Sequence, residues 1–267
     1  MFDIRDRVIV LTGATGALGG AIALSLAKAK VQLIVLGRNQ DLLEVLLKKL
    51  TPFTSVQAYV VNVMDRDDLI RVKKEIVKQY DRIDVLINAV GGNLPGAVIP
   101  DDKSVFDLSE SDFDEVVDLN LKGTLLPSLV FGEVMSQKGK GSIINYSSMA
   151  VDRVITRVLG YSASKAAMEN FTRWMAVEMA LKFGDGIRVN AIAPGFFIGK
   201  QNKDLLLNQD GSLTERGEKI IRNTPMKRFG EAEELNGPIH FLCSDSASFV
   251  TGIVLPVDGG FSAFSGV

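Results

Sequence analysis

Short, nearly continuous apolar runs rich in β-branched residues alternate with longer amphipathic stretches along the chain. The runs occupy residues 7–12, 31–36, 56–61, 83–88, 141–147, 187–193 and 253–257. Continuous hydrophobicity is typical of strands buried on both faces of a parallel sheet. Stretches with helical periodicity cover residues 17–30, 40–50, 66–80, 112–137, 161–183 and 232–244. The pattern predicts an α/β fold, a doubly wound Rossmann-type domain with a seven-stranded parallel sheet and helices on both faces.

Two connections between these elements are longer than the others, at about residues 91–109 and 196–224. Both follow the carboxyl ends of predicted strands, which is where doubly wound sheets bind their ligands. We therefore expect these two loops to form walls of a substrate pocket. No internal repeat or break in composition divides the chain, so we expect residues 1–267 to form a single domain that binds a dinucleotide and carries the catalytic residues.

The composition excludes several mechanisms. The chain of 267 residues has one cysteine, Cys243, one histidine, His240, and a formal net charge of −2. A lone cysteine cannot form an internal disulfide, which favours a reducing cytoplasm, and a lone histidine argues against a metal centre. The balanced charge gives no reason to expect nucleic acid or an anionic membrane as a partner. Proton transfer by this protein is expected to rely on neither histidine nor a metal.

One uncharged stretch, residues 8–27, has the length of a membrane span. Four glycines interrupt its apolar character, which favours a strand, a glycine turn and the start of a helix. The turn reads Thr-Gly-Ala-Thr-Gly-Ala-Leu-Gly over residues 12–19. Glycines at the first strand-to-helix crossing let the backbone approach a pyrophosphate, which the free N–H groups of the helix N-terminus then bind. We therefore predict a dinucleotide site here; a tight structural turn is the alternative.

The end of the second apolar run bears on the choice of dinucleotide. An acidic residue at this point would accept hydrogen bonds from the adenosine ribose. The sequence instead has Gly37 followed by Arg38. The glycine removes a repelling carboxylate, and an arginine can pair with a 2′-phosphate. The pattern favours NADP(H) over NAD(H), unless Arg38 is only a charged residue at the start of a helix.

A tyrosine and a lysine four residues apart open the helical stretch 161–183. Tyr161 and Lys165 share one face of a helix at this spacing. An ammonium group near a phenol favours the phenolate, so Lys165 is expected to lower the pKa of Tyr161 and make it a general acid and base. Ser148 follows the fifth apolar run and is placed to donate a hydrogen bond to a substrate oxygen. The spacing alone is weak evidence, because most such pairs lie on a helix surface.

Together these motifs resemble the short-chain dehydrogenase/reductase family over essentially the whole chain. The matching segments also include Asn88-Ala89-Val90-Gly91 and Pro194-Gly195. The resemblance implies hydride transfer to or from a nicotinamide and a tetrad of Asn120, Ser148, Tyr161 and Lys165. In it, Tyr161 exchanges the proton, Ser148 holds the carbonyl, Lys165 binds the nicotinamide ribose and Asn120 supports a water relay. The expected cofactor-binding residues are Gly13, Thr15, Gly16, Leu18, Gly19, Arg38, Asn62, Val63, Asn88, Ala89, Gly91, Tyr161, Lys165, Pro194 and Gly195.

A narrower set of segments looks like the D-mannonate oxidoreductase (fructuronate reductase) branch of that family. These segments are residues 91–93, 194–197, 201–202, 224–226 and 257–262. The likeness implies interconversion of D-fructuronate and D-mannonate, so we expect a sugar acid as substrate. Loop amides and cations suit the hydroxyls and carboxylate of such a molecule. The candidate substrate residues are Asn93, Arg157, Lys200, Gln201 and Asn202.

Other interpretations stay open. The same chemistry would serve a gluconate 5-dehydrogenase-like enzyme or a 3-oxoacyl reductase. A different class would be a non-catalytic dinucleotide-binding scaffold or redox sensor. We also expect a homotetramer or homodimer by analogy with the family, formed through the helices at residues 112–137 and 161–183. His240 and Cys243 are interpreted as structural residues.

Overall fold

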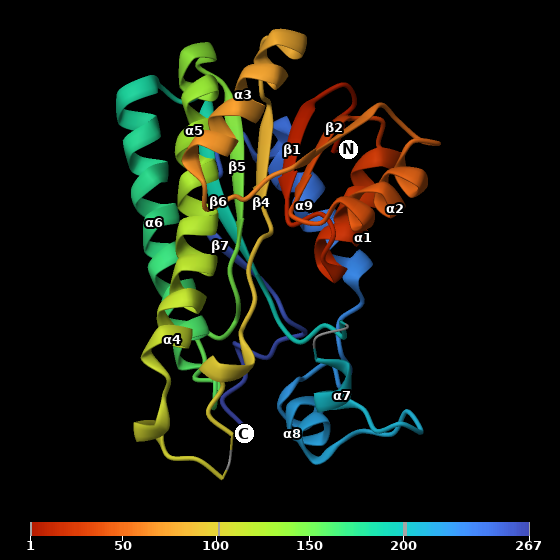
Figure 1. Cartoon of the computed structure of the whole chain (residues 1–267), viewed down its shortest axis with the longest axis vertical. Coiled ribbons are helices and arrows are strands. Elements are labelled where there is room, and N and C mark those ends of the chain that lie inside the picture. Colours follow the sequence, from red (N-terminus) through yellow and green to blue (C-terminus); the bar gives the residue numbers. More distant parts are fainter. Residues whose placement is uncertain (1, 101, 200–201, 267) are drawn as a thin grey trace.

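The seven predicted strands form one parallel sheet (Figure 1). The computed structural model describes residues 2–100, 102–199 and 202–266. The strands lie in the order β3-β2-β1-β4-β5-β6-β7, and every neighbouring pair is parallel. Their bounds are β1 Val8–Thr12, β2 Gln32–Gly37, β3 Val56–Val60, β4 Val85–Asn88, β5 Gly141–Tyr146, β6 Ile187–Pro194 and β7 Val254–Val257. The chain crosses back over β1 between β3 and β4, so the sheet is doubly wound as predicted.

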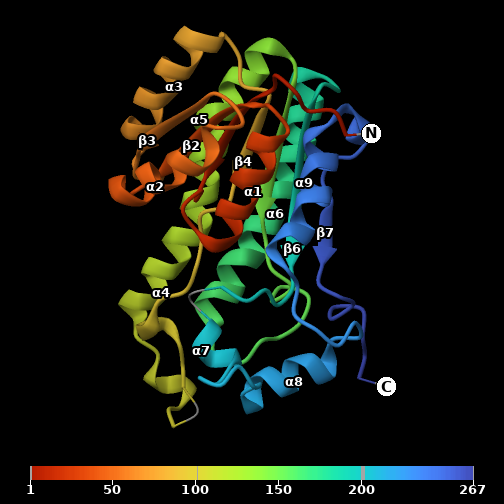
Figure 2. The same cartoon turned by 90° about the vertical axis from the view of Figure 1, so that its right-hand side faces the viewer.

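Helices cover both faces of the sheet (Figures 1 and 2). One face carries α1 (Ala17–Lys28), α2 (Gln40–Leu50) and α9 (Asn236–Cys243), and the other carries α3 (Arg66–Tyr80), α5 (Gly123–Lys138) and α6 (Leu159–Phe183). Alternate residues of β1 serve the two cores: Ile9 and Leu11 pack into the first, Val8 and Val10 into the second. This two-sided burial is the physical reason for the continuous apolar runs in the sequence.

Some helix boundaries differ from the prediction. The helix expected over residues 112–137 is divided into α4 (Glu110–Val117) and α5 by a π-helical turn at Asp118–Lys122. A π turn inserts one residue without changing the apolar character of the sequence, so periodicity does not reveal it. The last expected helix, residues 232–244, begins as a 3₁₀ turn at Ala232–Leu235 and only then becomes α9.

The two long connections contain short elements of their own. Residues 91–109 include 3₁₀ turns at Pro95–Ala97 and Val105–Asp107. Residues 196–224 include α7 (Lys203–Leu206) and α8 (Glu215–Asn223), neither of which was predicted. Thr214 caps α8 by accepting a hydrogen bond from the Gly217 N–H at 3.1 Å, a signal that the sequence did contain. Figure 1 shows both connections at the lower end of the molecule, beyond the carboxyl ends of the strands.

Residues 8–27 form β1, the glycine turn and α1. Throughout the described ranges, no helix combines the length and the apolar character needed to cross a bilayer. Within those same ranges, no three His, Cys, Asp or Glu side chains cluster closely enough to hold a metal ion. The imidazole Nε2 of His240 lies 3.0 Å from the Ser25 hydroxyl, a contact between α9 and α1.

Candidate active site

The turn between β1 and α1 has the geometry of a pyrophosphate site. Gly13 has a φ of +68°, and a Cβ there would lie 2.5 Å from the Ala89 carbonyl oxygen. A Cβ on Gly19 would lie 2.2 Å from the Gly13 carbonyl oxygen, so neither glycine tolerates a side chain. Gly16 is exposed just before α1, and its Cβ position has no neighbour closer than 3.3 Å. The N-terminus of α1 therefore stays open to an anionic group, and the turn fits a dinucleotide.

The end of β2 presents a glycine at position 37, whose Cβ position is closely surrounded by side-chain atoms. A Cβ on Gly37 would lie 3.2 Å from Leu43 Cδ2 and 3.4 Å from Thr15 Cγ2. Arg38 is exposed, and within the described part of the chain it has no hydrogen-bond or ion-pair partner. Asn39 uses its side chain to cap α2, accepting a hydrogen bond from the Leu42 N–H at 2.9 Å. The free guanidinium beside a helix N-terminus suits a phosphate.

The remaining cofactor candidates lie at the carboxyl ends of β3 and β4. Asn62 is exposed and Val63 is buried. Asn88 is fully buried, and its Nδ2 donates to Ser128 Oγ at 2.8 Å and to Asn145 Oδ1 at 2.9 Å. Asn88 thus ties β4 to α5 and β5. These bonds hold the carboxyl ends of β4 and β5 together, while Asn88 Oδ1 is buried without a partner.

Asn120 lies in the π-helical turn between α4 and α5 and clamps the chain after β4. Its Nδ2 donates to the carbonyl oxygens of Gly92 and Val116, each at 2.8 Å, and its Oδ1 accepts from the Gly92 N–H at 3.1 Å. A Cβ on Gly91 would lie 2.6 Å from Asn120 Oδ1 and 2.9 Å from Lys165 Nζ. Gly91, Asn120 and Lys165 are therefore direct neighbours. The π-helical turn that carries Asn120 is of a kind that occurs frequently at functional sites.

The other three members of the predicted tetrad meet at the start of α6. Lys165 is 3 % exposed, and its Nζ donates to the Tyr146 carbonyl oxygen at 2.7 Å. The same Nζ lies over the Tyr161 ring, 5.6 Å from its centroid. Ser148 is hydrogen-bonded to the Tyr161 side chain. The structure thus brings together the four side chains that sequence analysis selected from distant segments.

The pKa of Tyr161 shifts in the direction opposite to the one expected from its lysine neighbour. Burial raises the pKa of the Tyr161 phenol, and the hydrogen bond with Ser148 opposes this only in part. Burial also lowers the pKa of Lys165 to about 8. The expected lowering of the Tyr161 pKa by Lys165 is therefore wrong, because burial of the phenol has the largest effect and the opposing contribution comes from Ser148. Sequence spacing gives no measure of that burial.

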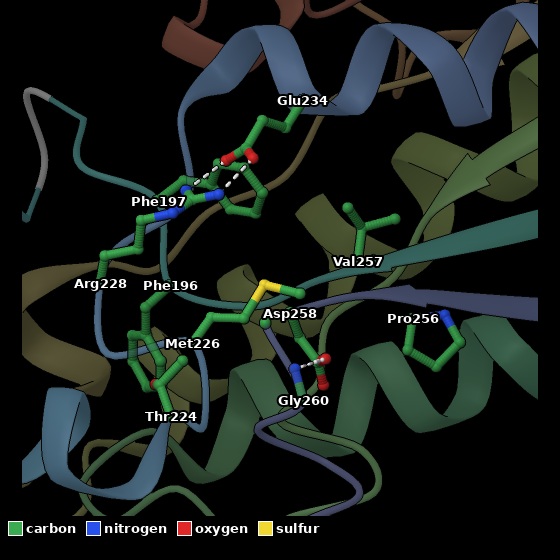
Figure 3. A pocket seen from close by; sticks show the side chains of 12 residues that line it. Phe196, Phe197, Thr224, Met226, Arg228, Glu234, Pro256, Val257, Asp258 and Gly260 are labelled. Carbon is green, nitrogen blue, oxygen red and sulfur yellow. Dashed lines mark hydrogen bonds and ion pairs between the residues drawn. The ribbon is translucent and has the colours of Figure 1, made fainter.

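A cavity of about 370 Å³ lies beyond the carboxyl ends of β6 and β7 (Figure 3). Gly195 adjoins it, and a Cβ there would lie 2.6 Å from the Cα of Asp258. Arg228 and Glu234 form a two-pronged ion pair on its wall, with distances of 2.7 and 2.6 Å. Residues 224–226 and 257–262, which contribute to this lining, carry part of the sequence resemblance but have no role predicted from the sequence. The lining residues are Phe196, Phe197, Thr224, Met226, Arg228, Gly230, Glu234, Pro256, Val257, Asp258, Gly259 and Gly260.

Two of the substrate candidates keep polar atoms without partners. Asn93 has both side-chain polar atoms buried and unpaired. Arg157 is half-buried, with a buried Nε that has no partner and a backbone φ of +79°.

Asn202 differs from those two. Its Oδ1 accepts from the Gly199 N–H at 2.7 Å, and its Nδ2 donates to the Phe197 carbonyl oxygen at 2.8 Å. Both atoms of its amide therefore hold its own loop in shape. Lys200 and Gln201 lie outside the described residues.

These features are those of a short-chain dehydrogenase/reductase. The chain matches the family model described as enoyl-(acyl carrier protein) reductase over residues 13–262. It is 43 % identical to the uncharacterized oxidoreductase UxuB of Bacillus subtilis, across 99 % of this chain and 98 % of that protein. It is 34 % identical to the 3-oxoacyl-[acyl-carrier-protein] reductase FabG of Thermotoga maritima, across 96 % of this chain and 98 % of that protein. The chain belongs to the short-chain dehydrogenase/reductase family.

Solved structures agree with this assignment. A "putative D-Mannonate oxidoreductase" from Haemophilus influenzae, with bound NAD, superposes with a TM-score of 0.92 at 40 % identity and covers 99 % of this chain and 98 % of its own. A "putative NAD(P) dependent gluconate 5-dehydrogenase" from Beutenbergia cavernae, with bound NADP, gives 0.84 at 32 % identity, over 98 % and 99 %. The protein is therefore an oxidoreductase that uses a nicotinamide cofactor.

Proposed function

We propose that the protein transfers a hydride between NADP(H) and a sugar acid, interconverting D-fructuronate and D-mannonate. The observation that supports the reaction is the assembly of Asn120, Ser148, Tyr161 and Lys165 in one site, of which Asn120 and Lys165 are buried. The sugar-acid substrate is supported by the likeness to the Haemophilus protein and by the matching segments of the sequence. We further propose that the whole chain acts as one catalytic domain, with residues 91–109 and 196–224 as substrate walls.

The proton steps follow from the geometry around Tyr161. In the reducing direction, the cofactor supplies a hydride to the carbonyl carbon. The Tyr161 hydroxyl gives its proton to the carbonyl oxygen, and Ser148 donates a hydrogen bond to the same oxygen. A tyrosine whose pKa is raised by burial keeps its proton near neutral pH, as a general acid must. Lys165 holds the nicotinamide ribose, and Asn120 supports the delivery of a replacement proton through water.

The preference for NADP(H) rests on the end of β2. Arg38 has no partner in the described part of the chain, and Gly37 presents no carboxylate. A 2′-phosphate would give the guanidinium a charged, geometrically matched partner. Thr15, next to Gly37, and Asn62 at the end of β3 would line the adenosine side of the same site.

A substrate panel tests this proposal against its enzymatic alternatives. Initial rates of NADPH and NADH oxidation are measured with D-fructuronate, 5-ketogluconate and an acetoacetyl thioester. We expect the highest kcat/KM with D-fructuronate and NADPH. A higher kcat/KM for 5-ketogluconate or for the thioester would favour the gluconate 5-dehydrogenase-like or the 3-oxoacyl reductase function. Cofactor binding with no turnover of any carbonyl would favour a scaffold or sensor.

We also propose that the protein is a homotetramer or homodimer of the cytoplasm. The exposed side of α6 presents an apolar stripe, in which Trp174 is 55 %, Val177 56 % and Leu181 79 % exposed. Burial of such a stripe against a second copy would stabilise an assembly. Sedimentation analysis of the wild type and of Trp174→Glu tests this; a wild-type monomer would contradict it. Cys243 is buried and unpaired, which agrees with a reducing compartment.

A further inference from the structure

Arg157 has a backbone conformation that an arginine adopts only under constraint. Its φ of +79° lies in the left-handed region, where the Cβ of an L-residue is crowded. The constraint comes from both sides: its carbonyl oxygen accepts a hydrogen bond from the Ile99 N–H at 3.0 Å, and α6 begins two residues later at Leu159. A glycine would fit this position without strain, so the fold alone gives no reason for an arginine.

The side chain of Arg157 is also left without a partner. Its Nε is buried and makes no hydrogen bond, and no carboxylate of the described residues forms an ion pair with it. Arg173 and Arg228, by contrast, form ion pairs, with Glu169 at 3.1 Å and with Glu234 at 2.6 Å, whereas Arg188 also keeps a buried Nη1 without a partner. A buried donor on a charged group without an acceptor is unfavourable. An anionic ligand would provide that acceptor.

The position of Arg157 in the fold connects it to the reacting groups. It lies in the segment between Ser148 and Tyr161, four residues before the tyrosine. The hydrogen bond from Ile99 joins this segment to the loop after β4, which begins at the Asn120 clamp. That loop carries Asn93, whose amide atoms are also buried without partners. Two segments that flank the tetrad thus each carry a polar side chain that the protein itself does not satisfy.

We propose that Arg157 is a specificity-determining residue that binds the carboxylate of the substrate while Ser148 and Tyr161 hold the reacting carbonyl. The proposal rests on the proposed function and adds the residue that distinguishes a sugar acid from a neutral sugar. The planar guanidinium presents its Nε–H and Nη–H donors in the fork geometry that a carboxylate accepts. The Asn93 amide, in the adjoining loop, offers a donor and an acceptor for a neighbouring hydroxyl.

If Arg157 binds the substrate carboxylate, its replacement should weaken substrate binding while making the folded protein more stable. Arg157→Gly removes both the strained backbone and the unpartnered guanidinium, so we expect a higher Tm than that of the wild type. The same change removes a charge-assisted contact with the substrate, so we expect the KM for D-fructuronate to rise roughly ten- to hundredfold. Arg157→Asn, which tolerates a positive φ, repeats the test with a different side chain.

The matched control is Lys30→Gly. Lys30 is an exposed cation with a φ of +61° in the turn between α1 and β2, away from the tetrad. Its replacement relieves a similar strain and removes a similar charge. We expect it to raise the Tm and to leave the KM for D-fructuronate unchanged.

The decisive comparison uses two substrates, D-fructuronate and the ketohexose in which a hydroxymethyl group replaces the carboxylate. In Arg157→Gly the KM should rise for the acid and stay the same for the neutral sugar, with the Kd for NADPH unchanged. An equal change for both sugars, or no change for the acid, overturns the role of Arg157 and leaves the proposed function standing.

A different failure would belong to the proposed function. If the wild type turns over no sugar acid, that function is overturned, and the role of Arg157 is then judged from binding. In the presence of NADP⁺, D-mannonate should raise the Tm of the wild type and have a smaller effect on Arg157→Gly. Equal Tm shifts in the two proteins overturn the role of Arg157.

Discussion

The candidate site has two sides, here called its floor and its roof. Polar side chains on the two sides differ in whether the protein itself provides their hydrogen-bond partners. On the floor, formed by the strand ends and the start of α6, Asn120 and Lys165 make hydrogen bonds to the protein itself. On the roof, formed by the loops after β4 and β5, Asn93 and Arg157 keep buried polar atoms without partners. The side chains of Asn120 and Lys165 are therefore held by the folded chain itself, although Asn88 Oδ1 and Ser162 Oγ on the floor are buried without partners. The roof leaves hydrogen-bonding capacity for a ligand, at a cost in stability.

The largest effect is expected from a change on the floor. Tyr161→Phe removes the hydroxyl that gives the proton and leaves the cofactor turn untouched. We expect kcat to fall by about a hundredfold to ten-thousandfold, the usual contribution of general acid catalysis. The Kd for NADPH, measured by fluorescence titration, should stay nearly the same. A variant with a near-wild-type rate would remove Tyr161 from the chemistry.

The floor was also the part that the sequence predicted best. The order and spacing of the motifs are specific to the family, and they contain Asn120, Ser148, Tyr161 and Lys165. The apolar runs of the sequence also predict that the strands are buried on both faces. The existence of the strands and their parallel, doubly wound arrangement therefore followed from periodicity and from the rule for parallel crossovers, whereas the full strand order is known only from the structure.

What escaped prediction depends on tertiary contacts. The π turn around Asn120 adds a residue that no hydrophobic period records. The helix α8 (Glu215–Asn223) lies in a connection for which the sequence predicts a loop, although Thr214 provides a cap. The side chain of Asn202, expected to meet the substrate, is engaged by Phe197 and Gly199 because the loop folds back on itself. The chemical type of a residue does not predict which hydrogen-bond partners the folded loop places beside its side chain.

Lys165 is a floor residue whose ammonium group has a hydrogen-bond partner, but burial of its positive charge is still unfavourable. Burial lowers its pKa from 10.5 to about 8, so between these pH values the unfolded chain binds a proton that the folded protein lacks. Stability from this group therefore rises with pH across that window, and the burial cost, about 3 kcal/mol, is fully present below pH 8. Lys165→Met should be about 2 kcal/mol more stable than the wild type at pH 7, after the lost hydrogen bond to Tyr146 is counted.

Urea denaturation of the two proteins at pH 7, 9 and 10 checks this sign. The difference in unfolding free energy should shrink as the pH rises, because the wild-type lysine becomes neutral in the folded state. Other titrating groups are common to both proteins and cancel in the difference. A difference that stays constant with pH would mean that Lys165 remains charged in the folded protein up to pH 10.

Arg38, which follows β2, resembles the roof residues in one respect, since it is a cation for which the described residues provide no partner. Arg38→Asp replaces a phosphate ligand with a repelling carboxylate that can accept from a ribose. We expect kcat/KM for NADPH to fall roughly ten- to hundredfold relative to that for NADH. Lys48→Asp is the control, because it makes the same charge change at the exposed far end of α2. An unchanged cofactor ratio in Arg38→Asp would refute the 2′-phosphate role.

The smallest effects are expected from replacing one asparagine on each side of the site, Asn88 on the floor and Asn93 on the roof. This pair tests most directly whether hydrogen-bond partners distinguish the two sides. Asn88→Ala deprives Ser128 and Asn145 of a donor in the buried core, so the unfolding free energy should fall by about 1–3 kcal/mol. Asn93→Ala removes two buried polar atoms that have no partners, so the unfolding free energy should stay the same or rise by about 1 kcal/mol. The two changes have the same chemistry, but Asn88 Nδ2 has two partners, whereas Asn88 Oδ1 and both polar atoms of Asn93 have none.

Activity should follow the opposite order. Asn93→Ala is expected to raise the KM for a sugar acid several-fold, because the amide loses its proposed hydroxyl contact. Asn88→Ala should leave that KM nearly unchanged at temperatures where it stays folded, since its side chain is engaged with Ser128 and Asn145 beneath the site. Urea denaturation and initial rates measured on the same preparations give both quantities. If Asn93→Ala proves as destabilising as Asn88→Ala, the Asn93 amide has a partner within the folded protein, and the distinction between floor and roof does not hold at that residue.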